Sequence, residues 1–118
     1  MNNTEFNEIL DFRIESTKAV LASKAKEYAH GDRLYNFKRD AEIEHNTLPK
    51  TLWGKATKHL VSVIDMVEGN LETTPAMVNE KIGDLINYLI LLEAVFKEKS
   101  INQKCVACGE CSNSEINQ

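Results

Sequence analysis

The sequence predicts a small all-α protein built as a four-helix bundle. Apolar residues recur at three- and four-residue steps, which is the spacing of one face of an α-helix. Stop and start signals divide this pattern into four segments. With 118 residues, 42% of them hydrophobic, the chain is long enough for one core and too short for two. We therefore expect one domain over residues 1–99, followed by a flexible cysteine-containing tail over residues 100–118.

The first two predicted helices cover residues 4–28 and 33–45. Between them, Gly31 permits the backbone angles of a helix end, and Asp32 is suited to cap the next helix. Their expected core residues share helical spacing: Phe6, Ile9, Leu10, Ile14, Val20 and Leu21, then Leu34, Phe37 and Ala41.

The last two predicted helices each start with a threonine and a proline. Thr47 precedes a helix that ends at Gly69, and Thr74 precedes one over residues 75–98; threonine caps free N–H groups and proline fits a first turn. The expected core residues are Leu52, Ala56, Leu60, Val63 and Val67, then Met77, Ile82, Leu85, Ile86, Leu89, Leu92 and Phe96. The fourth helix is apolar on more than one side, so it should be buried between the others.

Charge and cysteine placement exclude several classes of protein. A net charge of −4 argues against binding nucleic acid through its phosphates. The chain starts without a basic segment followed by an apolar one, and no apolar run approaches the roughly 18 residues of a membrane span. The three cysteines all lie within residues 105–111, so they cannot cross-link the rest of the chain. We expect a cytoplasmic protein.

The fourth predicted helix carries a polar stripe. Glu80, Asp84 and Asn87 are spaced i, i+4 and i+7, which places them on one face. Asp84 lies among apolar residues, and a buried carboxylate needs a partner or a metal ion. A salt bridge to a neighbouring helix explains the stripe as well as a functional site does.

The third predicted helix carries a second polar stripe of Lys58, Asp65 and Glu68. If the third and fourth helices run antiparallel, their acids can meet at one Mg²⁺ ion, a cation that takes oxygen ligands and keeps open positions for substrate phosphates. The alternative is that Asp65 and Glu68 are solvated near a helix end.

Five further residues are candidates for binding a substrate or transferring a proton. Arg33 and Asn36 lie at a turn and helix start, where an arginine can grip phosphate, although Asp32 can equally act there as a simple cap. His59 can serve as a base near neutral pH, or it can be structural. Tyr88 can stack on a base, as can Trp53, or either can belong to the core.

The tail has the spacing of a metal site. Cys105, Cys108 and Cys111 form a Cys-x-x-Cys-x-x-Cys pattern that suits Zn²⁺. Three thiolates do not close a structural zinc site, so a fourth ligand has to come from elsewhere. The alternative is a reduced, mobile tail.

The acid pattern resembles that of a known family. Asp65 to Glu68, then eleven residues, then Glu80 to Asp84 resembles the Glu-x-x-Glu and Glu-x-x-Asp metal motif of the all-α MazG-like nucleoside triphosphate pyrophosphohydrolases. Lys81 departs from it by occupying the place of a glutamate. Residues 20–96 also resemble small phage proteins described as nucleotide-modification-associated or dATP/dGTP diphosphohydrolase-like, through Lys26-Glu27-Tyr28, Gly31-Asp32-Arg33, Asn36-Phe37, Leu52-Trp53, Lys58-His59-Leu60 and the run from Ile82 to Tyr88.

The resemblance implies a Mg²⁺-dependent pyrophosphohydrolase of deoxynucleoside triphosphates that forms homo-oligomers. The implied roles are metal binding by Asp65, Glu68, Glu80 and Asp84, catalysis by Lys58 and His59, and substrate binding by Arg33, Asn36, Asn87 and Tyr88. Lys81 favours a different class, a non-catalytic viral protein that binds a nucleotide or a host protein. A third reading is a structural adaptor whose cysteine tail docks a partner.

Overall fold

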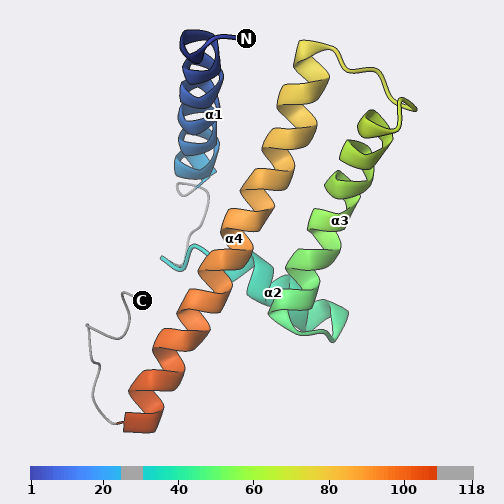
Figure 1. Ribbon diagram of the computed structural model, residues 1–118. Helices are drawn as coiled ribbons and strands as arrows, with labels where there is room; N and C mark the ends of the chain where they lie inside the picture. Colours follow the sequence, from blue (N-terminus) through green and yellow to red (C-terminus); the bar gives the residue numbers. More distant parts are fainter. Residues whose placement is uncertain (25–30, 109–118) are drawn as a thin grey trace.

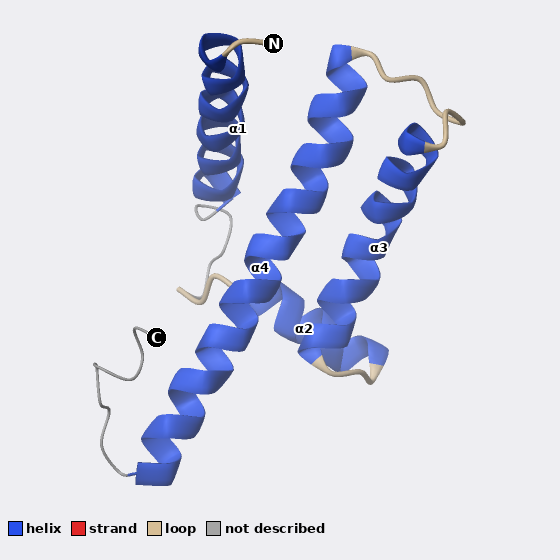
Figure 2. Ribbon diagram, viewed as in Figure 1, coloured by secondary structure: helices blue, strands red, loops and turns tan. Residues whose placement is uncertain are grey.

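The computed structural model describes residues 1–24 and 31–108, with side chains described up to residues 23 and 98 of these two segments. Within them the chain forms four helices and no strand (Figures 1 and 2). The helices are α1 (Asn3–Lys24), α2 (Tyr35–Glu44), α3 (Leu48–Val67) and α4 (Pro75–Cys108). The all-α prediction is confirmed.

Helix α4 is central to the arrangement. It runs antiparallel to α3, its most extensive neighbour, and α1 packs on its other side (Figure 1). The short helix α2 packs against α3 and passes behind α3 and α4 in this view. The prediction that the fourth helix lies between others is confirmed for these two sides of α4.

The predicted start signals of α3 and α4 and the predicted stop signal of α3 are confirmed. The Thr47 side chain accepts a hydrogen bond from the Lys50 N–H at 3.3 Å, and Thr74 accepts one from the Met77 N–H at 3.2 Å. Gly69 has a φ of +79°, a left-handed conformation that favours glycine and ends the helix.

Two other helix ends are set by residues whose roles were not predicted from the sequence. Asn2 and Glu5 cap α1 reciprocally, each side chain accepting from the other residue's N–H, at 2.8 and 3.2 Å. Helix α2 ends at Glu44, because His45 takes a left-handed φ of 54°. The predicted end at residue 45 was one residue too long.

The core lies where α2 meets α3 and α4. Leu52 is fully buried, and Leu34 and Val95 are each 4% exposed beside it. Ala41 and Ala56 are also buried. Fully burying a leucine contributes about 1.5–3 kcal/mol, so a few residues dominate the stability of this end of the molecule. Four of these five were predicted, and Val95 was not.

Eight predicted core residues are wrong. Five lie on α1 and are each between 42% and 55% exposed: Phe6, Ile9, Leu10, Ile14 and Val20. The other three lie on α3 and α4. Val67 is 82% exposed, Phe96 52% and Leu89 44%. The apolar pattern shows which side of a helix is apolar, but it does not show whether another helix covers that side. At these positions no other helix of the described residues does so.

The predicted end of the fourth helix is also wrong. Helix α4 continues past Glu98 to Cys108, so residues 100–108 of the expected tail are helical. Their sequence contains neither proline nor glycine before Gly109, so nothing in it stops the helix.

The described helices were also tested for membrane spans. In residues 1–24 and 31–108, no helix combines the length and the apolar character that crossing a membrane requires.

Candidate ligand-binding cavity

The polar stripe of α4 borders a cavity of about 340 Å³. Its lining comes from α1, α2 and the turn before it, α3 and α4: Val20, Leu21, Arg33, Phe37, His59, Asp84, Asn87, Tyr88 and Leu91. This volume is at the lower end of the range for small-molecule sites, which also combine apolar walls with a few convergent polar groups.

His59 on α3 faces two residues of α4. Its Nδ1 atom lies 3.7 Å from Asp84 Oδ2, and its ring stacks on Tyr88 with 5.2 Å between centroids and 21° between planes. Asp84 and Tyr88 are one helical turn apart, so both reach the same histidine. The side chain that faces Asp84 from the neighbouring helix is therefore a histidine, and not the lysine or arginine of an ordinary salt bridge.

Arg33 reaches the cavity from the turn before α2. Its Nη2 atom donates to the carbonyl oxygen of Leu21, near the end of α1, at 3.3 Å. The guanidinium therefore links α2 to α1 while it lines the cavity.

Asp32 fixes the turn that carries Arg33. Its Oδ1 atom accepts from the Leu34 N–H at 2.9 Å, and Oδ2 accepts from Lys38 Nζ at 2.7 Å. Lys38 also pairs with Glu98 of α4 at 2.9 Å. The Lys38 hydrogen bond lowers the pKa of Asp32, and the hydrogen bonds to Asp32 and Glu98 raise the pKa of Lys38. The prediction that Asp32 caps the helix is wrong, because the N-cap residue of α2 is Leu34 and no side chain caps it. Asp32 instead stabilises the turn before the helix, and so it holds Arg33 in place.

Asn87 presents an acceptor at the cavity wall. Its side-chain oxygen is buried, and no donor within the described residues reaches it. Buried polar atoms are nearly always hydrogen-bonded, so this oxygen is suited to accept from a ligand N–H or O–H or from water.

Two of the six residues predicted for catalysis or substrate binding lie elsewhere. Lys58 and Asn36 are exposed and do not line the cavity. Lys58 is turned about 100° from His59 around α3. It lies near a polar cluster between α2 and α3, in which Lys55 Nζ pairs with Asp40 at 2.6 Å and lowers the pKa of Asp40.

Hydrogen bonding to Asp40 raises the pKa of Glu44, which also belongs to that cluster. One carboxylate beside another disfavours the second charge. Glu44 lies one helical turn after Asp40 on α2, whereas Lys55 belongs to α3. The pair between Lys55 and Asp40 therefore connects α2 to α3.

The four acids of the predicted metal site are not gathered around the cavity. Asp84 lines it, whereas Glu80 is exposed and pairs with Lys81 at 3.4 Å. Asp65 is half-buried on α3, and Glu68 is exposed at its end. Among the described residues, no group of three or more histidine, cysteine, aspartate or glutamate side chains is placed to hold a metal ion.

The cysteine pattern falls largely beyond what is described. Cys105 and Cys108 belong to the last turns of α4, where no side chain is described, and Cys111 lies outside the described residues. The zinc site stays a prediction.

Sequence reasoning missed the apolar part of the cavity. Val20, Leu21 and Phe37 were expected in the core, and Leu91 was not singled out. No signal in the sequence separates an apolar residue that lines a cavity from one that fills a core.

We compared the chain with family models, with curated proteins and with solved structures, and nothing in any of the three matches it. The cavity is therefore interpreted from its own chemistry.

Proposed function

We propose that the chain binds a nucleoside phosphate in the cavity between its helices. The observation that carries the proposal is the convergence of Arg33, His59, Asn87 and Tyr88 on one cavity. These residues come from three separate segments of the chain. They combine a cation, an aromatic pair and a buried acceptor, which match the phosphate, the base and the hydrogen-bond donors of a nucleotide.

The phosphate is assigned to the Arg33 side of the cavity. A guanidinium binds phosphate oxygens with two parallel hydrogen bonds, and Asp32 already fixes the turn that presents it. His59 adds a second donor, and a second positive charge when it is protonated.

The base and sugar are assigned to Tyr88, the apolar walls and Asn87. Leu21, Phe37 and Leu91 offer an apolar surface, and the Asn87 oxygen accepts from an exocyclic amine or a sugar hydroxyl. A site that accepts a hydrogen bond from one particular ligand group discriminates strongly against ligands that lack this group.

Calorimetric titration tests this proposal. The four deoxynucleoside triphosphates and their unphosphorylated nucleosides are titrated into the native chain without metal, and only the phosphorylated compounds should bind. Arg33→Gln should weaken binding by roughly 10- to 100-fold, because a hydrogen bond to a charged group contributes about 1.5–3 kcal/mol.

Arg39→Gln is the matched control. Arg39 lies on α2, shortly after the turn that carries Arg33, and it is exposed and pairs with Glu42 at 2.8 Å. Circular dichroism establishes that each variant is folded. The proposal fails if the folded native chain binds none of the eight compounds, or if the two arginine variants lose affinity equally.

The second candidate function is the Mg²⁺-dependent release of pyrophosphate from a deoxynucleoside triphosphate. Asp84 lines the same cavity and its side chain is 42% exposed, so one carboxylate is accessible there. Mg²⁺ is commonly held by one or two carboxylates together with substrate phosphates. The remaining proposed Mg²⁺ ligands are Glu80, Asp65 and Glu68. Hydrolysis of deoxynucleoside triphosphates agrees with the cytoplasmic location that we expect from the sequence.

A pyrophosphate-release assay with Mg²⁺ separates the two functions. Asp84→Asn should abolish turnover, whereas Asp11→Asn, an exposed acid of α1, should not. Turnover that survives Asp84→Asn contradicts the metal assignment. If the native chain binds nucleotide without turnover, it is a non-catalytic binder. If a folded chain shows neither binding nor turnover, the structural adaptor is the interpretation that remains.

A further inference from the structure

A second cavity lies between α1 and the start of α4. Its volume is about 390 Å³, and it shares no lining residue with the cavity proposed for nucleotides. The lining comes from α1, from the loop after α3 and from the first turns of α4: Ile9, Phe12, Arg13, Thr73, Pro75, Val78 and Asn79. The two cavities can therefore hold separate ligands.

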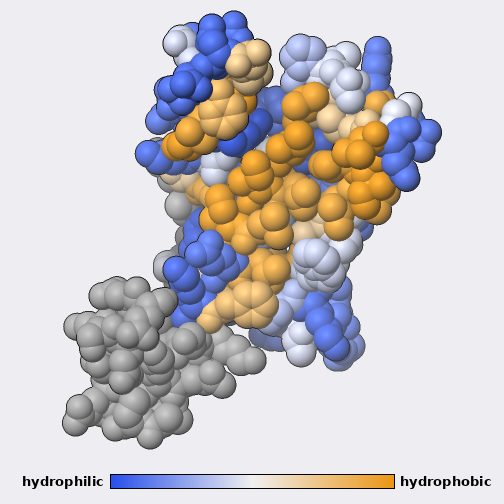
Figure 3. All heavy atoms as spheres, viewed as in Figure 1, coloured by the Kyte–Doolittle hydropathy of each residue, from blue (hydrophilic) through white to orange (hydrophobic). Residues whose placement is uncertain are grey.

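The walls of the second cavity are mostly apolar. Ile9 and Phe12 are three residues apart on α1, so they share a face, and they are 54% and 55% exposed. Pro75 and Val78 line the cavity from α4. Figure 3 shows a strip of hydrophobic side chains on α1, beside the hydrophobic side chains of α4. A ligand with an apolar chain would remove such side chains from water, which is favourable.

Arg13 is the one charged residue in the lining of the second cavity. It is half-buried, and its Nη2 atom donates to the side-chain and main-chain oxygens of Asn79, at 2.6 and 3.4 Å. Both of these acceptors are neutral. Within the described residues Arg13 forms no ion pair, whereas Arg39 and Lys38 both do. A cation that is partly withdrawn from water without a counter-charge favours an anionic ligand.

The Arg13 guanidinium is held in one orientation beside the second cavity. Its Cζ atom lies 5.8 Å from the centre of the Phe12 ring, and its Nη1 atom lies against Gly83. The three N–H donors on Nε and Nη1 have no acceptor within the described residues. The Asn79 side-chain oxygen is engaged, so Asn79 presents its amide nitrogen as a further donor. A carboxylate beside Arg13 therefore finds its donors already in place.

We propose that the second cavity binds a free monocarboxylate with an aliphatic chain, that is, a fatty acid of medium length. The carboxylate lies at Arg13 and Asn79, and the chain lies along Ile9, Phe12 and Val78. A single cation matches one negative charge, whereas a phosphate monoester carries nearly two. A bilayer of anionic lipids offers similar chemistry, but the exposed acids of α1 oppose it. These acids are Glu5, Glu8, Asp11 and Glu15.

Calorimetric titration of the full chain with decanoate tests the proposal. Decanoate should bind, acetate should not bind measurably, and decanol, which lacks the charge, should bind at least roughly 10-fold more weakly. From hexanoate to decanoate, each added methylene should tighten binding by up to about four-fold, the factor that corresponds to burying one CH₂ group. Arg13→Gln should abolish the preference for decanoate over decanol.

Val78→Asp is a second variant, and it leaves the contact between Arg13 and Asn79 intact. It places a carboxylate in the second cavity, so it should weaken decanoate binding by roughly 10-fold or more and leave nucleotide binding unchanged. Ala76→Asp is the matched control, because it adds the same charge to the same turn of α4 outside the lining. It should leave decanoate binding nearly unchanged. Circular dichroism establishes that each variant is folded.

The proposal is overturned if the folded native chain does not bind decanoate, or if it binds decanol equally well. It is equally overturned if Ala76→Asp weakens decanoate binding as much as Val78→Asp does. Binding to vesicles of anionic phospholipid without binding to decanoate also contradicts it. Because the two cavities share no lining residue, the fatty-acid proposal and the nucleotide proposal fail independently.

Discussion

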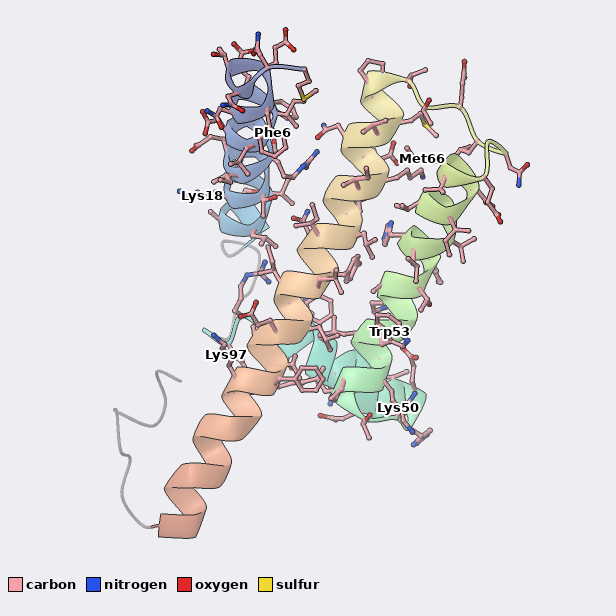
Figure 4. The ribbon with its side chains drawn as sticks, in the orientation of Figure 1. Phe6, Lys18, Lys50, Trp53, Met66 and Lys97 are labelled. Carbon is pink, nitrogen blue, oxygen red and sulfur yellow. The ribbon has the colours of Figure 1, made fainter. Side chains whose placement is uncertain are left out.

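The end of the molecule where α2 meets α3 and α4 differs sharply from the end formed by α1. At the first end, Leu52 is fully buried and Leu34 and Val95 are nearly so. On α1, Phe6 is 55% exposed and Leu10 45%, although both belong to an apolar stripe. Figure 4 shows Phe6 on α1, well separated from Trp53 on α3. One end is closed by packing, and the other is held by fewer contacts.

A polar contact holds α1 to α4. Arg13 Nη2 donates to the side-chain oxygen of Asn79 at 2.6 Å, and the guanidinium lies against Gly83. The cavity lies between the two regions, because Val20 and Leu21 come from α1 whereas Phe37, Tyr88 and Leu91 pack against the core. The wall of the cavity next to the core is therefore supported by packing, whereas the α1 wall depends on how α1 is attached.

The largest expected effect comes from removing the same side chain in each region. Leu52→Ala should lower the free energy of unfolding by about 3 kcal/mol, since it leaves a cavity in a closed core. Leu10→Ala on α1 should lower it by less than about 1 kcal/mol, because nearly half of that side chain is already in water. Urea denaturation measures both. Equal losses would remove the distinction between the regions.

An intermediate effect is expected from the ion pairs that brace the Arg33 turn. Lys38→Met removes the contacts of Lys38 with Asp32 and Glu98, whose side chains are about one-third exposed, and should cost about 0.5–1 kcal/mol at neutral pH. Lys97→Met is the control, because it removes a more exposed pair within α4 and should cost about 0.3 kcal/mol. Denaturation at several pH values measures both.

The pH dependence of the Lys38 effect has a definite sign. The pKa of Asp32 is lowered from 3.8 in the folded chain, so its stabilising contribution is present above pH 3.8 and is lost as the pH falls through the lowered value. The pKa of Lys38 is raised from 10.5, so its contribution is lost only as the pH rises beyond 10.5. The difference between the native chain and Lys38→Met should be constant between these values and should shrink in acid. A difference that grows below pH 3.8 would contradict the assignment.

The smallest net effect on overall stability is expected from a substitution at Gly83, for which Gly54 is the control. A Cβ atom at Gly83 would lie 2.6 Å from Arg13 Nη1, whereas one at Gly54 would meet nothing within 4 Å. Gly54→Ala should stabilise the chain by about 0.5–1 kcal/mol through helix propensity. Gly83→Ala gains the same propensity but displaces Arg13, so its net change should be within about 0.5 kcal/mol of zero.

Amide hydrogen exchange distinguishes the two glycine variants. Exchange in α1 should become several-fold faster in Gly83→Ala, because Arg13 loses its contact with Asn79, and should be unchanged in Gly54→Ala. If α1 exchanges at the native rate in both, Arg13 does not attach α1 to α4.

The sequence was sufficient for features that depend on neighbouring residues. The caps at Thr47 and Thr74 and the stop at Gly69 are local, and each lies where it was predicted. The buried stripe of Leu52 and Ala56 follows from helical spacing alone.

Features that depend on the register between helices could not be predicted. Val95 is buried and the adjacent Phe96 is exposed, a choice that only the position of α2 and α3 decides. Lys38 and Glu98 lie far apart in sequence, and so do His59 and Asp84, yet each pair meets in the fold. The spacing of Glu80, Asp84 and Asn87 predicted a shared face, and Asp84 and Asn87 do line one cavity, whereas Glu80 does not. The spacing could not show that His59 and Arg33 complete the cavity while Lys58 and Asn36 do not.

Chemical-shift mapping tests the central claim, nucleotide binding in the cavity, most directly. A deoxynucleoside triphosphate is added to the isotope-labelled chain, and amide shifts are followed along the sequence. We expect the largest changes at Leu21, Arg33, His59, Asn87 and Tyr88, with little change at Val61 and Ile64, which lie on α3 outside the cavity. Changes confined to residues outside the cavity, or no changes at saturating nucleotide, would contradict the account.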